Sequence, residues 1–239
     1  MSRREKNMAM YDDFARSQLD GCKWTIARAP LGDGSFWEWR DANAVVALGG
    51  GRCAINIHRF SSFNDAVQIF DNPKHLYLAT RSWETGGGTF RFSAKLAGEV
   101  TGDPHDYRDG FAAFNVLDFE TAMVFDIITN GRHVWAIYER LFIPGATTEK
   151  EAFTEVVDLG VETAPMMEHD VAVEFDAAAA RVRYFVDGEE KLVREGLPAI
   201  PKQLTTGFGL ITLWPIAYEK SVSIKGQGGS LSIGDVGVE

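Results

Sequence analysis

The sequence is poor in the features that mark membrane, secreted or nucleic-acid-binding proteins. It has no run of 18 apolar residues, which excludes a transmembrane helix of ordinary length. No apolar stretch follows the basic residues Arg3, Arg4 and Lys6, so no secretory signal is recognisable. Acidic residues outnumber basic ones by 34 to 24, whereas nucleic-acid binders usually carry a basic stripe. We therefore expect a cytoplasmic protein with neither a membrane nor a nucleic acid as its partner.

Cysteine is also scarce. Cys22 and Cys53 are the only two, too few for the disulfide framework of a small secreted domain, and we expect two free thiols. No cluster of Cys and His has the spacing of a zinc site, so the sequence predicts no metal and no other cofactor.

Proline is rare and glycine common, with 8 and 24 residues, and the glycines separate short alternating stretches typical of strands. About a dozen strands without helices between them can bury their apolar faces only sheet against sheet. The sequence thus predicts an all-β, antiparallel β-sandwich forming one domain over 1–239, with 1–10 as a flexible tail. Short helical turns are expected at 63–70 and 147–152. The expected strands are 44–48, 53–58, 75–81, 88–96, 111–117, 121–128, 133–141, 153–159, 171–175, 182–186, 191–194, 208–214 and 230–236.

Asn130-Gly131 lies between two apolar runs and predicts a two-residue type I′ hairpin, because both turn positions need a positive φ. Thr129 then pairs with Arg132, and Val124 pairs with Ile137. This register puts six mostly apolar side chains on one face, which would pack on the other sheet. They are Met123, Phe125, Ile127, Val134, Ala136 and Tyr138.

The opposite face of this hairpin mixes carboxylates, a Trp, a His and aliphatic residues. Such a face is typical of a ligand groove, although a solvent-exposed or loop-covered face is the alternative. We expect Glu139 and Asp126 to form an acid–base pair, since an apolar wall raises the pKa of a carboxyl group. Trp135 would stack on the ligand, with Glu120 and His133 at the edge of the groove.

Three further tryptophans are candidates for ligand contacts. Trp37 and Trp39 flank Glu38 and share a face if this segment is a strand, and Trp83 precedes a run of glycines. Tryptophan rings bind sugars and aromatic molecules but also fill cores. His105 stands in a polar loop between two Asp residues, where it could bind a metal or act as an acid or base, although isolated loop histidines are more often inert.

Several stretches resemble the concanavalin A-like lectin and glucanase superfamily of jelly rolls. These are Tyr11-Asp12-Asp13-Phe14 with Trp24, and His169 followed by the strands 171–176 and 182–188. The stretch 114–141 is similar to a bacterial domain family of unknown function with this fold. The resemblance implies two large antiparallel sheets, with ligands on the concave one. Glucanases of this fold carry Glu-x-Asp-x-x-Glu on one strand, and Asp118-Phe119-Glu120 does not continue that pattern.

Two functions fit these features, and a purely structural or self-associating role stays open. The first is an intracellular enzyme that performs non-covalent acid–base chemistry, such as isomerisation, cyclisation, elimination or hydrolysis, on a small and partly apolar molecule. No Gly-x-Ser-x-Gly motif suggests covalent catalysis. The second is a non-catalytic module that binds a carbohydrate or another small molecule. A homo-oligomer is possible in either case.

Overall fold

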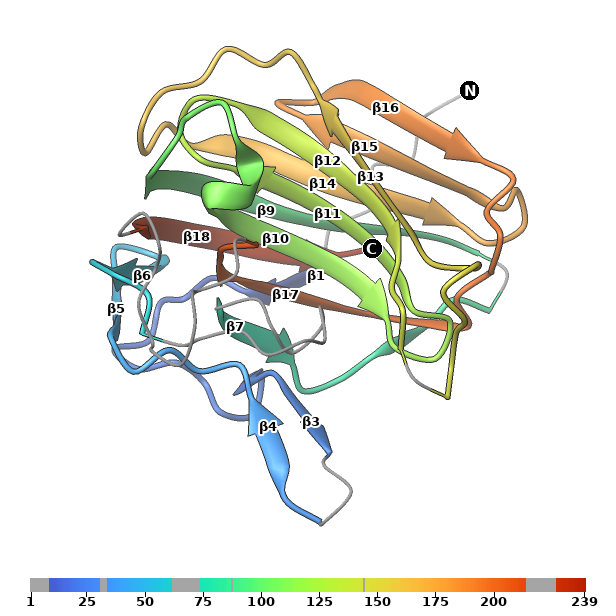
Figure 1. Ribbon diagram of the computed structural model, residues 1–239, viewed down its shortest axis with the longest axis horizontal. Helices are drawn as coiled ribbons and strands as arrows, with labels where there is room; N and C mark the ends of the chain where they lie inside the picture. Colours follow the sequence, from blue (N-terminus) through green and yellow to red (C-terminus); the bar gives the residue numbers. More distant parts are fainter. Residues whose placement is uncertain (1–8, 31–33, 62–73, 87, 144, 214–226) are drawn as a thin grey trace.

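The chain folds into two packed antiparallel sheets (Figure 1). This computed structural model describes residues 9–30, 34–61, 74–86, 88–143, 145–213 and 227–239. One sheet, here called the pocket sheet, has the order β13-β12-β11-β10-β17-β7-β2, with β8 also paired to β17. Its strands are β13 (Phe153–Asp158), β12 (Val134–Arg140), β11 (Met123–Thr129), β10 (Phe111–Asp118), β17 (Gln203–Ile211), β7 (Lys74–Ala79), β2 (Trp24–Ile26) and β8 (Trp83–Glu84).

The second sheet, here called the opposite sheet, has the order β16-β15-β14-β9-β18-β6-β5, with β1 also paired to β18. Its strands are β16 (Glu189–Glu195), β15 (Arg181–Val186), β14 (His169–Asp176), β9 (Thr89–Thr101), β18 (Gly228–Val238), β6 (Arg52–Ile57), β5 (Ala44–Gly49) and β1 (Ala9–Asp12). The two-stranded ribbon β3 (Arg28–Pro30) and β4 (Phe36–Glu38) projects at the bottom of Figure 1. The predicted all-β sandwich of jelly-roll type is confirmed.

The main core lies between the two sheets, because strands with period-two alternation turn every second side chain inward. All six apolar residues predicted for the inner face of the β11–β12 hairpin belong to this core. Phe92, Val173 and Tyr184 meet them from the opposite sheet. Burying each such side chain contributes roughly 1.5–3 kcal/mol to the stability of the folded chain.

The predicted strands are present, with differences mainly at their ends. β9 and β17 are longer than expected. Where both faces of a strand are buried, polar and apolar residues no longer alternate, so the sequence pattern does not mark where the strand ends. Ala9 and Met10, expected in the tail, begin β1 and pair with β18. The segment 147–152 forms turns, as expected, and the candidate helix at 63–70 lies outside the described residues.

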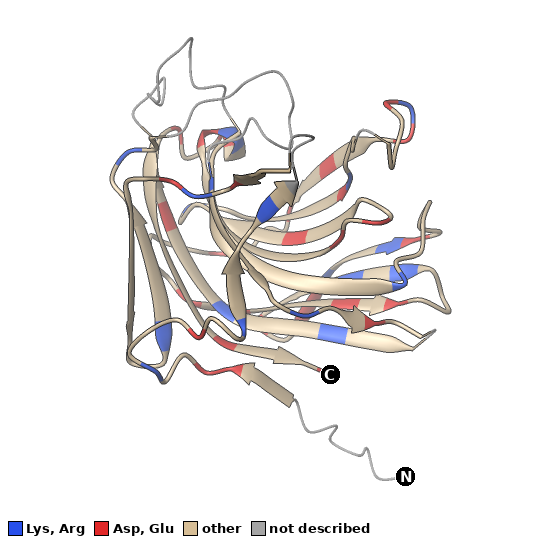
Figure 2. Cartoon of the chain, turned by 90° about the horizontal axis from the view of Figure 1, so that it is seen from below, with Lys and Arg blue, Asp and Glu red and all other residues tan. Residues whose placement is uncertain are grey.

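Charges of both signs are scattered over the strands, and Figure 2 shows no single basic stripe on the described part of the chain. In this part, no helix is long and apolar enough to cross a membrane. Both cysteines are free thiols, with Cys22 exposed and Cys53 buried. Burial raises the pKa of the Cys53 thiol to about 12, with a smaller contribution from the charge of Asp12.

Candidate functional site

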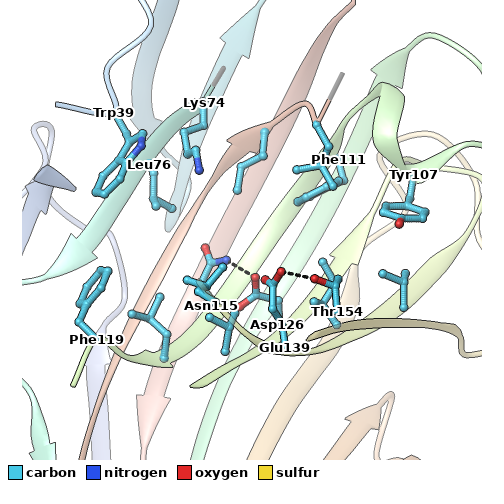
Figure 3. Close-up of a pocket in the computed structure, with 17 residues that line it drawn as sticks. Trp39, Lys74, Leu76, Tyr107, Phe111, Asn115, Phe119, Asp126, Glu139 and Thr154 are labelled. Atoms are coloured by element: carbon cyan, nitrogen blue, oxygen red, sulfur yellow. Dashed lines mark hydrogen bonds between the residues drawn. The ribbon is translucent and has the colours of Figure 1, made fainter. Parts of the chain in front are cut away.

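Four polar side chains form a row across the outer face of the pocket sheet, which is the face turned away from the core. Asn115 on β10, Asp126 on β11, Glu139 on β12 and Thr154 on β13 come from four consecutive strands (Figure 3). Asn115 donates a hydrogen bond from Nδ2 to Asp126 Oδ2 at 2.7 Å, and Thr154 Oγ1 donates to Glu139 Oε1 at 2.5 Å. Each carboxyl group is therefore held from one side by a neutral donor, and the two carboxyl groups are neighbours.

The register of β11 and β12 differs by two residues from the predicted one. Val124 pairs with Glu139 and Asp126 pairs with Ile137, so Asp126 and Glu139 are diagonal neighbours on one face. A shift of two preserves the faces, because side chains alternate with period two. Diagonal neighbours of this kind lie about 7–8 Å apart, with a somewhat shorter distance between their Cβ atoms. The true register thus brings the predicted acid–base pair closer together than the expected one did.

The cause of the shift is the loop between these strands, which has four residues rather than two. Asn130 Oδ1 accepts hydrogen bonds from the backbone N–H groups of Arg132 and His133, and Thr129 Oγ1 donates to the carbonyl of His133. Among the four loop residues 130–133, Gly131 alone has a positive φ, of 83°. A type I′ turn needs two such residues. The prediction of a two-residue turn was therefore wrong.

Burial shapes the electrostatics of the two carboxyl groups. It raises the pKa of Asp126 well above the ordinary value, while the hydrogen bond from Asn115 lowers it and the charge of Glu139 raises it further. Burial also raises the pKa of Glu139, against lowering contributions from the Thr154 hydrogen bond and the charge of Lys74. Asp126 Oδ1 and Asn115 Oδ1 are buried and have no hydrogen-bond partner among the described residues, which is unusual for buried polar atoms.

Apolar side chains from two clusters enclose this polar row. One cluster is built around Trp39 where β3 and β4 meet the sheet, and the other lies around Phe111 and Tyr107 at the opposite end. The cavity between them has a volume of about 110 Å³, on the scale of the roughly 150 Å³ that holds a benzene molecule. Its apolar lining is Trp39, Leu76, Tyr107, Phe111, Leu117, Phe119, Val124, Ile137, Leu141, Val156, Ile211 and Leu213. Among the described residues, its polar lining is Lys74, Asn115, Asp126, Glu139 and Thr154.

The structure separates some of the other predicted site residues from this pocket. Glu120 lies in the exposed turn after β10, beside Asp118, whose carboxylate accepts hydrogen bonds from the backbone of Glu120 and Thr121. Glu120 therefore does not line the cavity. Trp135 is buried on the outer face but does not line the cavity, because Tyr107 and His133 pack against its ring. His133 is half-buried in the β11–β12 loop.

The three other tryptophans divide between two places. Trp39 lines the pocket, and the ammonium group of Lys74 lies 5.4 Å from the centre of its ring. Trp37 packs on the same apolar cluster without reaching the cavity. Trp83 packs against Tyr11 and Phe92 at the edge of the main core, away from the pocket.

Lys74, Asn115, Thr154 and Tyr107 are pocket residues that the sequence did not single out. Asn115 had a usable signal, because it interrupts the apolar run of β10 between Phe111 and Leu117. Thr154 had none, since Glu155 and Asp158 of the same short strand are polar as well. Lys74 carries no such signal, since its place depends on the pairing of β7 with β17, in which its partner is the distant residue Ile211. Among the described residues, no group of three or more His, Cys, Asp or Glu side chains could hold a metal ion.

Similar solved structures confirm the fold. The endo-1,3-beta-glucanase from Streptomyces sioyaensis is 17% identical with a TM-score of 0.63, over 100% of this chain and 98% of that one. The kappa-carrageenase from Pseudoalteromonas carrageenovora is 12% identical with a TM-score of 0.60, over 100% and 96%. The alginate lyase AlgAT5 is 13% identical with a TM-score of 0.55, over 91% and 94%. At these identities the likeness shows the fold alone.

Two further comparisons concern the sequence. Residues 11–239 match a protein family described as a family of unknown function, DUF6081. A comparison with proteins of curated function found no significant match.

Proposed function

The chain belongs to DUF6081, a family of unknown function, and we propose from its pocket that it is an enzyme of non-covalent acid–base chemistry. Its substrate is a small and largely apolar molecule bound on the outer face of the pocket sheet. The observation that carries the proposal is the pair of neighbouring carboxyl groups, Asp126 and Glu139, set in unlike surroundings within an apolar cavity.

The surroundings of the two carboxyl groups support a different role for each. Asp126 is only 6% exposed, and one of its oxygens has no hydrogen-bond partner in the described part of the chain, so the neutral acid is the favoured form. Burial also raises the pKa of Glu139, but Glu139 is only half-buried and the Thr154 hydroxyl favours its carboxylate form, while the charge of Lys74 favours the carboxylate form of both groups. Two carboxyl groups whose environments push their pKa values apart can act as acid and base. Asp126 is the proton donor in this proposal and Glu139 is the base.

The chemistry follows from these two protonation states. Glu139 takes a proton from a carbon or hydroxyl of the substrate, and Asp126 gives its proton to a substrate oxygen. The electron pair left by the first proton moves within the substrate, so the net reaction is an isomerisation or an elimination. No nucleophilic side chain is needed, which agrees with the lack of a nucleophile motif in the sequence.

The cavity lining supports an apolar substrate. The twelve apolar lining residues far outnumber the five polar ones, and a site of this kind orients its ligand with few polar groups. Clusters around Trp39 and around Tyr107 border the cavity at two ends. This shape favours a small molecule over a long polymer.

The test is consumption of a metabolite. Purified protein is incubated with a small-molecule extract of the cells that produce it, and the mixture is compared by mass spectrometry with one treated with Glu139→Gln. We expect at least one compound to be converted by the native protein and not by the variant. Glu149→Gln, at an exposed position outside the pocket, is the matched control and should behave as the native protein.

No converted compound, or equal conversion by Glu139→Gln, would contradict the assignment of Glu139 as the base. A compound retained by the protein but recovered unchanged would favour a binding module instead.

A carbohydrate is the second candidate ligand. The solved structures that share this fold include enzymes named for their action on glucans, carrageenan and alginate. Unlike the single-strand Glu-x-Asp-x-x-Glu pattern, the carboxyl groups here come from two strands, β11 and β12. A glycan array distinguishes the candidates, because binding of an oligosaccharide that Trp39→Ala abolishes would favour the carbohydrate.

A further inference from the structure

A second cluster of titratable groups lies outside the pocket, where the loop before β10 meets the β11–β12 loop. The ring nitrogens His105 Nδ1 and His133 Nε2 lie 3.2 Å apart. On its other side, His133 Nδ1 lies 2.7 Å from Asp158 Oδ2. We propose that His105 and His133 form a binding site for a divalent transition-metal ion such as Zn²⁺, Ni²⁺ or Cu²⁺, with Asp158 orienting His133.

The proton positions support this site. A carboxylate can only accept, so the contact with Asp158 places a proton on Nδ1 of His133. In the neutral ring, Nε2 of His133 then presents a lone pair toward His105. A metal-bound histidine typically donates its other N–H to a carboxylate, and this contact fixes the ring orientation and raises the basicity of the ligand nitrogen. Asp158 and His133 have this arrangement, and Nε2 of His133 accepts a hydrogen bond from Nδ1 of His105, whose proton a bound ion would replace.

The spacing of the two nitrogens also fits. Two imidazole nitrogens bound to one tetrahedral zinc ion, each at about 2.0–2.1 Å, lie about 3.3 Å from one another. The observed separation of His105 Nδ1 and His133 Nε2 is 3.2 Å. Imidazole nitrogen is a preferred ligand of zinc, copper and nickel. Water would complete the coordination, since only two protein ligands are present among the described residues.

The two rings are held in place by their loops. Asn130 donates from Nδ2 to the carbonyl of Pro104 at 2.9 Å, which ties the β11–β12 loop to the loop that carries His105. His133 stacks on Trp135, with ring centres 5.1 Å apart. A site made of such fixed groups needs little reorganisation when the ion binds.

A comparison with another histidine shows why this pair differs from a structural contact. His169 Nδ1 also faces an aspartate, Asp187, at 2.7 Å. Its second nitrogen lies 2.9 Å from the hydroxyl of Thr163, and His169 is buried, so an ion in solution does not reach this ring. His105, by contrast, is exposed, and an ion can reach it.

The consequence of metal binding lies at the wall of the pocket. The segment that carries His105 continues into η1 (Tyr107–Asp109), and Tyr107 lines the pocket. An ion shared by the two histidines would clamp this segment to the β11–β12 loop. The site would therefore stabilise one wall of the cavity, whether or not the cavity is catalytic.

The experiment is calorimetric titration of the full chain with ZnCl₂ and NiCl₂, in a Cys22→Ser background because the exposed Cys22 thiol also binds such ions. We expect one ion per chain, with binding lost in His105→Ala. Asp158→Asn should weaken binding about 10- to 100-fold, as for other outer-shell partners. His58→Ala, at an exposed histidine outside this site, should leave it unchanged.

Electron paramagnetic resonance of the Cu²⁺ complex gives an independent readout. Coupling to two imidazole nitrogens in the Cys22→Ser protein, absent in His105→Ala, is the expected spectrum. No binding of any of the three ions, or binding that His105→Ala leaves intact, would overturn the proposal.

Discussion

Asp126 and Glu139 sit on neighbouring strands, but their surroundings differ. Asp126 is nearly fully buried and receives a hydrogen bond from Asn115, while its second oxygen has no hydrogen-bond partner among the described residues. Glu139 is half-buried and receives a hydrogen bond from the Thr154 hydroxyl. Burial raises the pKa of both groups, and the pKa of Asp126 lies well above its ordinary value.

Asp126→Asn should raise the free energy of unfolding at pH 7–8 by on the order of 1 kcal/mol, since one pKa unit corresponds to about 1.4 kcal/mol. The raised pKa means that the folded chain favours the neutral acid. The stability from this preference is complete below about pH 4, where unfolded aspartate is protonated, and is lost as the pH rises through the folded pKa. Denaturant unfolding from pH 4 to 9 measures this, and the variant should show a flatter pH dependence than the native chain.

An equal pH dependence in the two proteins would show that Asp126 is ionised in both the folded and the unfolded chain. The neutral acid, and with it the role of proton donor, would then be wrong.

Thr154→Val should raise the pKa of Glu139 further, because the Thr154 hydroxyl stabilises the carboxylate. The loss of this one hydrogen bond should cost about 1 kcal/mol of stability at neutral pH. Carbon-13 NMR titration of the glutamate carboxyl signals measures the shift directly. An unchanged or lowered pKa would contradict the hydrogen bond from Thr154.

For the strands β11 and β12, the sequence predicted which side chains face the core but not how the two strands pair. The alternation of β11 and β12 correctly predicted which side chains face the core, because that depends only on a period of two. The register depends on the β11–β12 loop, where the side chains of Thr129 and Asn130 bond to the backbone. The sequence does not reveal these side-chain hydrogen bonds, because Asn130-Gly131 reads the same in a four-residue loop as in an ordinary two-residue turn. The row of pocket residues also needs strand pairings between distant segments, as Lys74 on β7 illustrates.

Gly131→Ala should destabilise the chain by about 1–3 kcal/mol, because φ at this position is 83° and a Cβ would lie 2.8 Å from the carbonyl oxygen of Gly98. Gly188→Ala is the matched control. It has a similar φ of 79° but open space around the added carbon, so its cost should be near 1 kcal/mol. Thermal unfolding compares the two, and equal losses would contradict the close approach of the β11–β12 loop to Gly98.

At the scale of the whole molecule, the opposite sheet supports the site from behind. Tyr184 on β15 crosses the core and donates a hydrogen bond from its hydroxyl to the carbonyl of Ile137 on β12, at 3.0 Å. Ile137 lies two residues from Glu139 and lines the pocket. The sandwich architecture was predictable from the strand pattern. This contact was not, because it depends on how the sheets are placed over one another.

Tyr184→Phe should lower the free energy of unfolding by about 1 kcal/mol, the usual cost of one buried hydrogen bond. Tyr138→Phe, whose hydroxyl makes no hydrogen bond to a described residue, should cost less. Denaturant unfolding followed by two spectroscopic probes measures both variants. An effect of Tyr184→Phe no larger than that of Tyr138→Phe would contradict the link between the sheets.

The central claim is that the outer face of the pocket sheet binds a small, largely apolar molecule beside Asp126 and Glu139. The most direct test is a crystal structure after soaking with a mixture of aromatic acids and monosaccharides. The account predicts density for an aromatic compound in the cavity between Trp39 and Tyr107, within hydrogen-bond distance of Asp126 or Glu139. Density for bound compounds only at other places on the molecule would contradict it.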